Sequence, residues 1–266
     1  MTSPTPAHRY SPRVARILLA GTALAAALLA LAPRTAAADA REEDPTRVLL
    51  VTGEDFPGHV WQETTPVLRD QIERDERLQV EVVEELNFLR SPRLADYDVV
   101  VMHFKNYDPE VPGPAGWENL EAFVRRGGGL VLVHFACGAF QEWPDFVKLA
   151  GRIWNPDLPA HDPHGTFRVD IVDHDHPITR GMESFETIDE LYTCLDGDTP
   201  IRVLATATSV VDGEDYPMAF VLDYGEGRVF HSPLGHDVAA FEVPEVGALF
   251  RRGTAWTAGL EPAAAP

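Results

Sequence analysis

The sequence predicts an α/β fold: a three-layer α/β/α sandwich whose sheet is mainly parallel, with antiparallel strands at its edge. In the first half of the chain, short β-branched runs alternate with segments of helical spacing, which is typical of βαβ units and a parallel sheet. The second half changes to strands joined by turns, which indicates the antiparallel part. The 228 residues after position 38 are enough for one such domain without disulfide support.

The first half supplies the expected parallel strands and their helices. Each strand is a run rich in Val, Leu and Ile, and each helix has apolar residues three or four positions apart, such as Leu68 and Ile72. Three glycines at 127–129 end the second helix and lead into the next strand. The expected elements are strands 47–52, 78–83, 98–104 and 130–135, and helices 61–74, 116–126 and 143–149.

The second half supplies the antiparallel strands and a closing helix. The last two strands flank Tyr224, Gly225 and Glu226, a short connection typical of an antiparallel hairpin. The final helix is amphipathic, with apolar residues from Val246 to Trp256. The expected elements are strands 167–172, 202–206, 218–223 and 227–231, and helix 244–256.

Both ends of the chain are expected to lie outside the domain. Residues 1–38 combine a basic start, an apolar run from 17 to 31 and a small-residue site at 36–38, which predicts a secretory signal peptide cleaved after Ala38. A retained membrane anchor is the alternative, although the apolar run is short for a span. We expect a disordered leader at 39–46, one domain at 47–260 and a disordered tail at 261–266. The mature protein is then exported, either to the periplasm or into the medium.

The net charge of the chain limits the classes of molecule that we expect it to bind. Four of the 22 basic residues and none of the 42 acidic residues lie within 1–38, so the mature chain carries a formal charge near −24. This charge argues against nucleic acid and anionic membrane as partners and favours a neutral small molecule. The two cysteines, Cys137 and Cys194, either pair in an oxidising compartment or serve as small buried apolar side chains. The oligomeric state is left open.

Histidines fall where strands are expected to end. His103 and His134 lie at the ends of two apolar runs, and His59 and His236 follow two others after short turns. Because the carboxyl ends of parallel strands share one edge of the sheet, and ligands bind at that edge, we expect these imidazoles to gather in a pocket. Imidazole titrates near neutral pH and is the commonest metal ligand. The pattern therefore predicts a functional site, although His103 is also suited to packing at a strand end.

Three further segments carry candidate groups. His161 lies in a His/Asp loop, whereas the neighbouring His174 and His176 fit a solvated turn better. Asp189 and Glu190, followed by Tyr192, can divide acid, base and hydrogen-bonding roles, but adjacent carboxylates are common in an acidic protein. Cys137 follows a strand, as a thiol nucleophile would, yet the glycines of a Gly-x-Cys-x-Gly elbow are absent.

Taken together, these stretches resemble one family. The segments 58–61, 127–134, 175–179, 189–192 and 225–237 are similar, in this order, to those of the ThuA-like (trehalose utilisation) family. The resemblance covers nearly all of the mature chain and implies a fold similar to class I glutamine amidotransferases, which is flavodoxin-like. As a rule the family lacks the amidotransferase Cys–His–Glu triad. Cys137 is therefore a departure whose role stays open.

The resemblance also implies a function in carbohydrate catabolism, through the processing of 3-keto-glycosides. A ketone at C3 acidifies the C2 proton, so a base can remove this proton and expel the C1 substituent, after which water adds. On this hypothesis His236, steered by Asp237, is the base. His134 and His161 polarise the ketone, with or without a divalent metal such as zinc, and Asp189 or Glu190, with Tyr192, protonates the leaving group.

The remaining expectations concern binding and the competing functions. We expect His59, Trp61, His161, Cys137 and His103 to contact substrate, and His134, His161 and His236 are the candidate metal ligands. A non-catalytic sugar-binding protein and a metal-dependent hydrolase that activates water remain the alternatives. The tryptophans that could stack on a sugar face, or lie in the core instead, are Trp61, Trp143 and Trp154.

Overall fold

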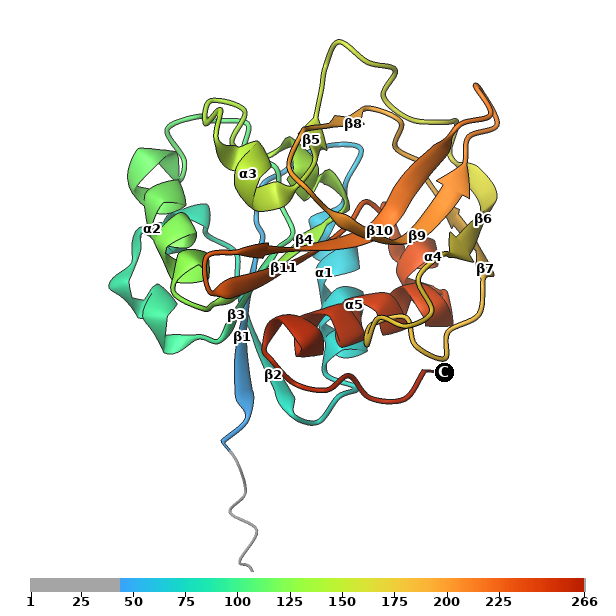
Figure 1. Ribbon diagram of the computed structural model, residues 1–266. Coiled ribbons are helices and arrows are strands. Elements are labelled where there is room, and N and C mark those ends of the chain that lie inside the picture. The colour runs from blue at the N-terminus through green and yellow to red at the C-terminus, as the bar shows by residue number, and fades with distance from the viewer. Residues whose placement is uncertain (1–43, 266) are drawn as a thin grey trace, which may run out of the picture. The chain divides into compact units, whose positions relative to one another are not determined.

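The computed structural model of the protein describes residues 44–265 (Figure 1). The expected signal peptide at 1–38 and most of the expected leader lie outside these residues. Residues 261–265 have no regular secondary structure, and Arg252 and Arg77 donate hydrogen bonds to the carbonyls of Ala263 and Glu261. Within residues 44–265 no helix is long and apolar enough to cross a bilayer.

One nine-stranded sheet forms the middle layer, in the order β2-β1-β3-β4-β11-β10-β9-β6-β7. Five neighbouring strands are parallel: β2 (Leu78–Val83), β1 (Thr46–Val51), β3 (Val99–Met102), β4 (Gly129–Val133) and β11 (Gly227–Ser232). The other four continue the sheet through antiparallel pairing: β10 (Asp215–Tyr224), β9 (Arg202–Thr208), β6 (Gly165–Ile171) and β7 (Phe185–Asp189).

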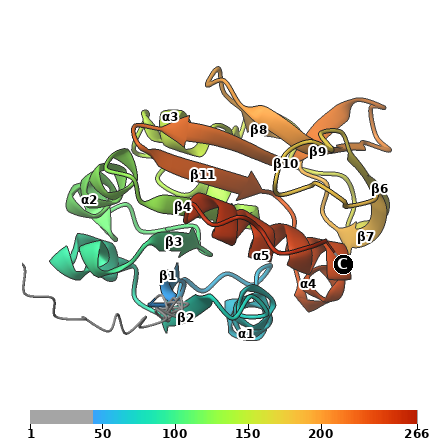
Figure 2. The same ribbon diagram turned by 60° about the horizontal axis from the view of Figure 1, so that its bottom comes forward.

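Helices cover both faces of the sheet (Figures 1 and 2). One face carries α1 (Trp61–Ile72), α4 (Val238–Glu242) and α5 (Pro244–Thr257). The other carries α2 (Gly113–Arg125) and α3 (Phe146–Ala150), with the short 3-10 helices η1 (Leu86–Arg90) and η2 (Pro92–Asp96).

Because side chains alternate between the two faces of each strand, the sheet has an apolar core on each face. In β1, Val48 and Leu50 pack on the side of α1 and α5, whereas Leu49 and Val51 pack on the side of α2. Because successive side chains point to opposite faces, a strand buried on both sides needs a continuous apolar run, as the sequence has here. The predicted α/β sandwich, with its parallel sheet and antiparallel edge strands, is confirmed.

The structure differs from the expected elements at a few places. β7 is not among the strands expected from the sequence, although its residues alternate between buried and exposed as a strand should. The 3-10 helix η3 (His134–Gly138) and the small sheet of β5 (Ile153–Trp154) and β8 (Leu195–Asp196) were not expected either. The strand expected at 130–135 ends at Val133, because His134 has a φ of 47° and starts η3.

His231 on β11 illustrates a histidine used for packing. It is fully buried, its Nδ1–H donates to the Ala150 carbonyl at 2.9 Å, and its Nε2 has no partner. Burial lowers the pKa of His231 to about 4, although the bond to Ala150 opposes this shift. The imidazole is therefore neutral in the folded protein at neutral pH.

We expect His231→Asn to reduce the acid sensitivity of folding. As pH falls from 7 to 5, the unfolded chain protonates His231 and the folded chain does not, so this group makes folding less favourable. The wild type should lose about 1–2 kcal/mol more unfolding free energy than His231→Asn over this range. Urea unfolding at the two pH values measures the difference. Equal losses in both proteins would contradict the assignment.

Candidate functional site

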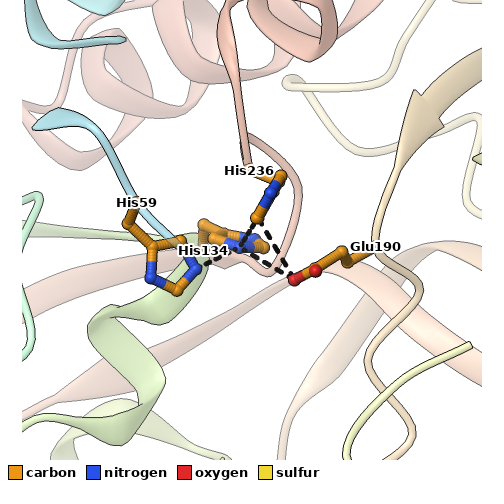
Figure 3. A group of neighbouring side chains, drawn as sticks. All are labelled: His59, His134, Glu190 and His236. Carbon is orange, nitrogen blue, oxygen red and sulfur yellow. Dashed lines mark hydrogen bonds and ion pairs between the residues drawn. The ribbon is translucent and has the colours of Figure 1, made fainter. Parts of the chain in front are cut away.

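Four side chains converge where the parallel strands end. His59 follows β1, His134 follows β4, His236 follows β11, and Glu190 follows β7 of the antiparallel part. One ligand atom from each lies within 4.8 Å of all the others, and Figure 3 shows the four groups pointing toward one another. We call His59, His134, Glu190 and His236 the His–Glu cluster. Three of the four histidines expected at this edge therefore meet, and the fourth, His103, does not join them.

His134 lies at the centre of the cluster and is fully buried. Its Nδ1 is 2.7 Å from the carbonyl oxygen of Pro233, which only accepts hydrogen bonds, so Nδ1 carries the proton. Burial, followed by the proximity of the His59 imidazole, lowers the pKa of His134 well below its ordinary value. The ring is therefore neutral, and Nε2 presents its lone pair to the site.

Polar atoms surround Nε2 of His134. The Tyr192 hydroxyl lies at 2.8 Å, Nε2 of His59 at 3.1 Å and Nδ1 of His236 at 3.4 Å. The His59 ring stacks on Phe135 with centroids 4.3 Å apart, which fixes its orientation. Burial lowers the pKa of His59 to about 4, so His59 is also neutral at neutral pH.

Glu190 is the carboxylate that contacts His236. Its Oε2 lies 3.2 Å from Nδ1 of His236 and 3.7 Å from Nε2 of His134. Burial lowers the pKa of His236, but the hydrogen bond and charge of Glu190 outweigh it, so the net shift is upward. Burial likewise opposes ionisation of Glu190, and the bond with His236 reverses this, so its pKa falls.

Asp237, expected to steer His236, has other partners. One of its carboxylate oxygens caps α4 by accepting the N–H of Ala240 at 3.0 Å, and the other lies 3.3 Å from Nε2 of His164. Glu190 instead occupies the steering position.

Asp189 points away from the pocket and holds the loop that carries His236. Its two carboxylate oxygens accept the N–H groups of Gly235 at 2.7 Å and His236 at 3.1 Å. Burial raises the pKa of Asp189 to about 7, although these backbone bonds oppose the rise. Gly235 has a φ of 108°, and a Cβ there would lie 2.5 Å from the Phe241 ring. The loop geometry therefore depends on a glycine and on one buried carboxylate.

His161 stands on the other side of Glu190. Its Nδ1–H donates to the Asp162 carbonyl at 2.7 Å, so Nε2 is the ring nitrogen left for the pocket, and it lies 3.7 Å from Oε1 of Glu190. Its side chain is 32% exposed. The expected ligand trio of His134, His161 and His236 is thus not the group that the structure brings closest. The groups that lie closest together are His134 and His236 with His59 and Glu190.

Three members of the cluster, His59, Glu190 and His236, form one side of a pocket of about 250 Å³. Phe56, Tyr107 and Trp154 supply aromatic walls, and Tyr192 and His161 also line it. A larger cavity of about 760 Å³ shares Trp154, but none of the cluster residues line it. The chemistry therefore belongs to the smaller pocket.

Lys105, which was not among the residues expected from the sequence, also lines this pocket. Its Nζ lies 5.3 Å from the ring centroid of Tyr107 and 5.9 Å from that of Trp154. Across residues 44–265, no carboxylate comes within ion-pair distance of Lys105. Its position directly after the expected strand 98–104 was the available signal.

Several candidates lie outside the pocket lining. His103 is buried, with its ring nitrogens 3.0 and 3.4 Å from the hydroxyls of Thr65 and Thr64, which anchors the start of α1. The Trp61 indole donates to Asp55, and the Trp143 ring stacks on Trp117.

The cysteines have no place in the pocket lining either. Cys137 is a buried free thiol that packs with Cys194 and Tyr192. Burial, followed by the proximity of Cys194, raises the pKa of Cys137 well above its ordinary value. This disfavours the thiolate that a nucleophile requires.

We expect Asp189→Asn to destabilise the protein and displace His236. All hydrogen bonds that the carboxylate accepts come from backbone N–H groups, so an amide NH₂ would leave one buried donor unpaired. The cost should be on the order of 1–3 kcal/mol of unfolding free energy. Urea unfolding measures this cost. Glu186→Gln, an exposed change on the same strand, is the control. A variant as stable as the wild type would contradict the anchoring role.

Comparison with known proteins agrees with this architecture. Residues 47–257 match the family model described as ThuA, trehalose utilisation. A protein from Parabacteroides merdae described as ThuA-like is 26% identical over 84% of this chain and 93% of its own, with a TM-score of 0.72. A second ThuA-like protein, from Bacteroides uniformis, is 18% identical over 84% of this chain and 96% of its own, with a TM-score of 0.65.

A search of curated proteins found no match. The family model nevertheless spans all of the sheet except Thr46, and it includes every residue of the His–Glu cluster. The chain therefore belongs to the ThuA (trehalose utilisation) family, with a carbohydrate-related role.

Proposed function

We propose that this protein is an exported enzyme that cleaves or isomerises 3-keto-glycosides by proton abstraction and elimination, followed by hydration. The observation that carries the proposal is the pocket itself. Three members of the His–Glu cluster line it together with His161, Tyr192, Lys105 and aromatic rings, and His134 lies buried behind them. Its volume of about 250 Å³ is near the lower end of small-ligand sites, roughly 300 Å³. This size suits one sugar ring, and the aromatic walls suit its apolar face.

The reaction needs a base, an acid and a group that holds the enolate oxygen. A base removes the C2 proton of the keto-sugar, a C1=C2 double bond forms, and the C1–O bond breaks as its oxygen takes a proton. Water then adds its hydroxyl to C1 and its proton to C2. The ketone carries the negative charge in between, which is why a 3-keto group makes the step accessible.

Geometry favours His161 as the base instead of His236. The Asp162 carbonyl fixes the Nδ1–H tautomer of His161, so its Nε2 lone pair faces the pocket and its side chain remains open to substrate. Burial raises the pKa of Tyr192 well above its ordinary value, so Tyr192 stays protonated and can protonate the leaving oxygen. Lys105 brings positive charge to the pocket without a carboxylate partner among the described residues, which suits an enolate oxygen.

Export is supported by the sequence of residues 1–38, with its basic start, apolar run and Ala36–Ala38 site. The protein recovered from the periplasm or medium should begin at Asp39, as N-terminal sequencing would show.

The decisive experiment compares a 3-keto-glucoside with its unoxidised parent glucoside. The purified protein should release the aglycone only from the keto-sugar. In D₂O, the product should carry deuterium at C2, because the C2 proton is exchanged during elimination and hydration. Binding of the keto-sugar without turnover or exchange would contradict the proposal and favour a non-catalytic sugar-binding protein.

We expect His161→Ala to lower kcat for the keto-glucoside by roughly 10²–10⁴-fold, the usual contribution of a general base. Deuterium exchange at C2 should fall in parallel, because both depend on proton removal. His174→Ala is the matched control, since His174 is exposed and lies outside the pocket lining. Equal losses in both variants would argue against a specific role for His161.

Lys105→Met should lower kcat by roughly 10²–10³-fold, comparable to the loss of one donor to a developing oxyanion. The methionine keeps the length and apolar contacts of the side chain, so the folded state should persist. The chain has one other lysine, Lys148, which forms an exposed ion pair with Asp145. Lys148→Met should leave kcat unchanged, and steady-state kinetics on the two variants test the difference.

A further inference from the structure

We propose that the His–Glu cluster is a binding site for a divalent first-row transition metal ion of the zinc class. The ligands are Nε2 of His59, Nε2 of His134, Nδ1 of His236 and a carboxylate oxygen of Glu190. The inference of a metal site stands on the geometry of the cluster. The role of the ion, as the group that polarises the ketone of a bound keto-sugar, rests on the proposed function.

The spacing of the four ligand atoms fits one ion. In a tetrahedral zinc site with ligands about 2.0–2.1 Å from the metal, neighbouring ligand atoms lie about 3.3–3.4 Å apart. In this protein His59 and His134 are separated by 3.1 Å, His134 and His236 by 3.4 Å, and His236 and Glu190 by 3.2 Å. The fourth contact, between His134 and Glu190, is 3.7 Å. All four ligand atoms lie within 4.8 Å of one another, and Figure 3 shows His134 between the other three groups.

Hydrogen bonds alone do not account for this arrangement. Because Nδ1 of His134 donates to Pro233, Nε2 has a single lone pair and accepts one strong hydrogen bond. The Tyr192 hydroxyl already lies at 2.8 Å, yet two more imidazole nitrogens and a carboxylate oxygen lie within 3.7 Å. Where no proton lies between two of these atoms, their lone pairs repel one another. A metal cation that displaces the remaining protons would accept a lone pair from all four ligands.

The donor set selects the class of ion. Three imidazoles with one carboxylate suit zinc and neighbouring transition metals, whereas magnesium and calcium prefer oxygen ligands throughout. The Pro233 carbonyl fixes the tautomer and orientation of His134, as outer partners of metal-bound histidines commonly do. His59, Glu190 and His236 also line the pocket, so one side of the centre faces the substrate. An ion there would supply Lewis-acid polarisation of a carbonyl oxygen.

The histidines of the pocket provide an internal control. Nε2 of His161 lies 3.7 Å from Glu190, but His161 is not part of the set of ligand atoms within 4.8 Å of one another. A general affinity of imidazole-rich surfaces for metal would involve His161 as much as His59. A metal centre made of the four proposed ligands would not involve His161.

Calorimetric titration of the chelator-treated protein with ZnCl₂ tests the site without any substrate. We expect one ion per chain, and His59→Ala, His236→Ala and Glu190→Gln should each raise Kd on the order of a hundredfold or more. His161→Ala should keep the wild-type Kd, and MgCl₂ should give no comparable binding. Zinc should also raise the Tm of the wild type but not that of Glu190→Gln. Without zinc the two proteins should have the same Tm, which excludes misfolding as the cause of lost binding.

The outcomes separate the metal site from the proposed function. Absence of stoichiometric zinc binding, or an equal loss in His161→Ala and His59→Ala, would overturn the metal site. Stoichiometric zinc binding without turnover of the 3-keto-glucoside would leave the metal site standing and overturn the proposed function. Full turnover by protein that elemental analysis shows to be metal-free would overturn the catalytic role of the ion and leave the proposed function standing.

Discussion

The hydrogen bond from Nδ1 of His134 to the Pro233 carbonyl organises the site. It joins the end of β4 to the segment after β11, two parallel neighbours in the sheet, and it is fully buried. One contact sets the tautomer, the ring plane and the direction of the Nε2 lone pair. The positive φ of His134 is compatible with this geometry because the chain turns sharply into η3 there. His59, Tyr192 and His236 are then arranged around a fixed acceptor.

The two kinds of strand pairing contribute different parts of the site. The parallel strands bring His59, His134 and His236 to one edge, as their loops must follow the carboxyl ends. The antiparallel strands add Glu190 through the end of β7. Asp189 connects the two halves, since its carboxylate binds backbone N–H groups of the loop after β11. The site is therefore assembled from segments more than 170 residues apart, between His59 and His236.

Much of the fold and part of the site follow from the sequence. Apolar runs predicted the parallel strands, and the edge of the sheet predicted that His59, His134 and His236 would meet. The roles of Asp189 and Glu190 could not be told apart, because the strand β7 that directs them to opposite sides was not predicted. Adjacency suggested Asp237 as the partner of His236, but the start of α4 uses that carboxylate. Lys105 belongs to no motif, and its position directly after an expected strand was the one sequence signal that it offered.

Asp189 fixes the loop after β11 through the main chain and not through the reactive side chain of His236. Its bonds reach the backbone N–H groups of Gly235 and His236 and leave the imidazole untouched. The path of the main chain is therefore independent of which side chain stands at position 236. Evolution, or a protein engineer, can exchange the reactive group there while the loop keeps its shape. Such a fixed platform allows a family with one fold to diversify its chemistry one side chain at a time.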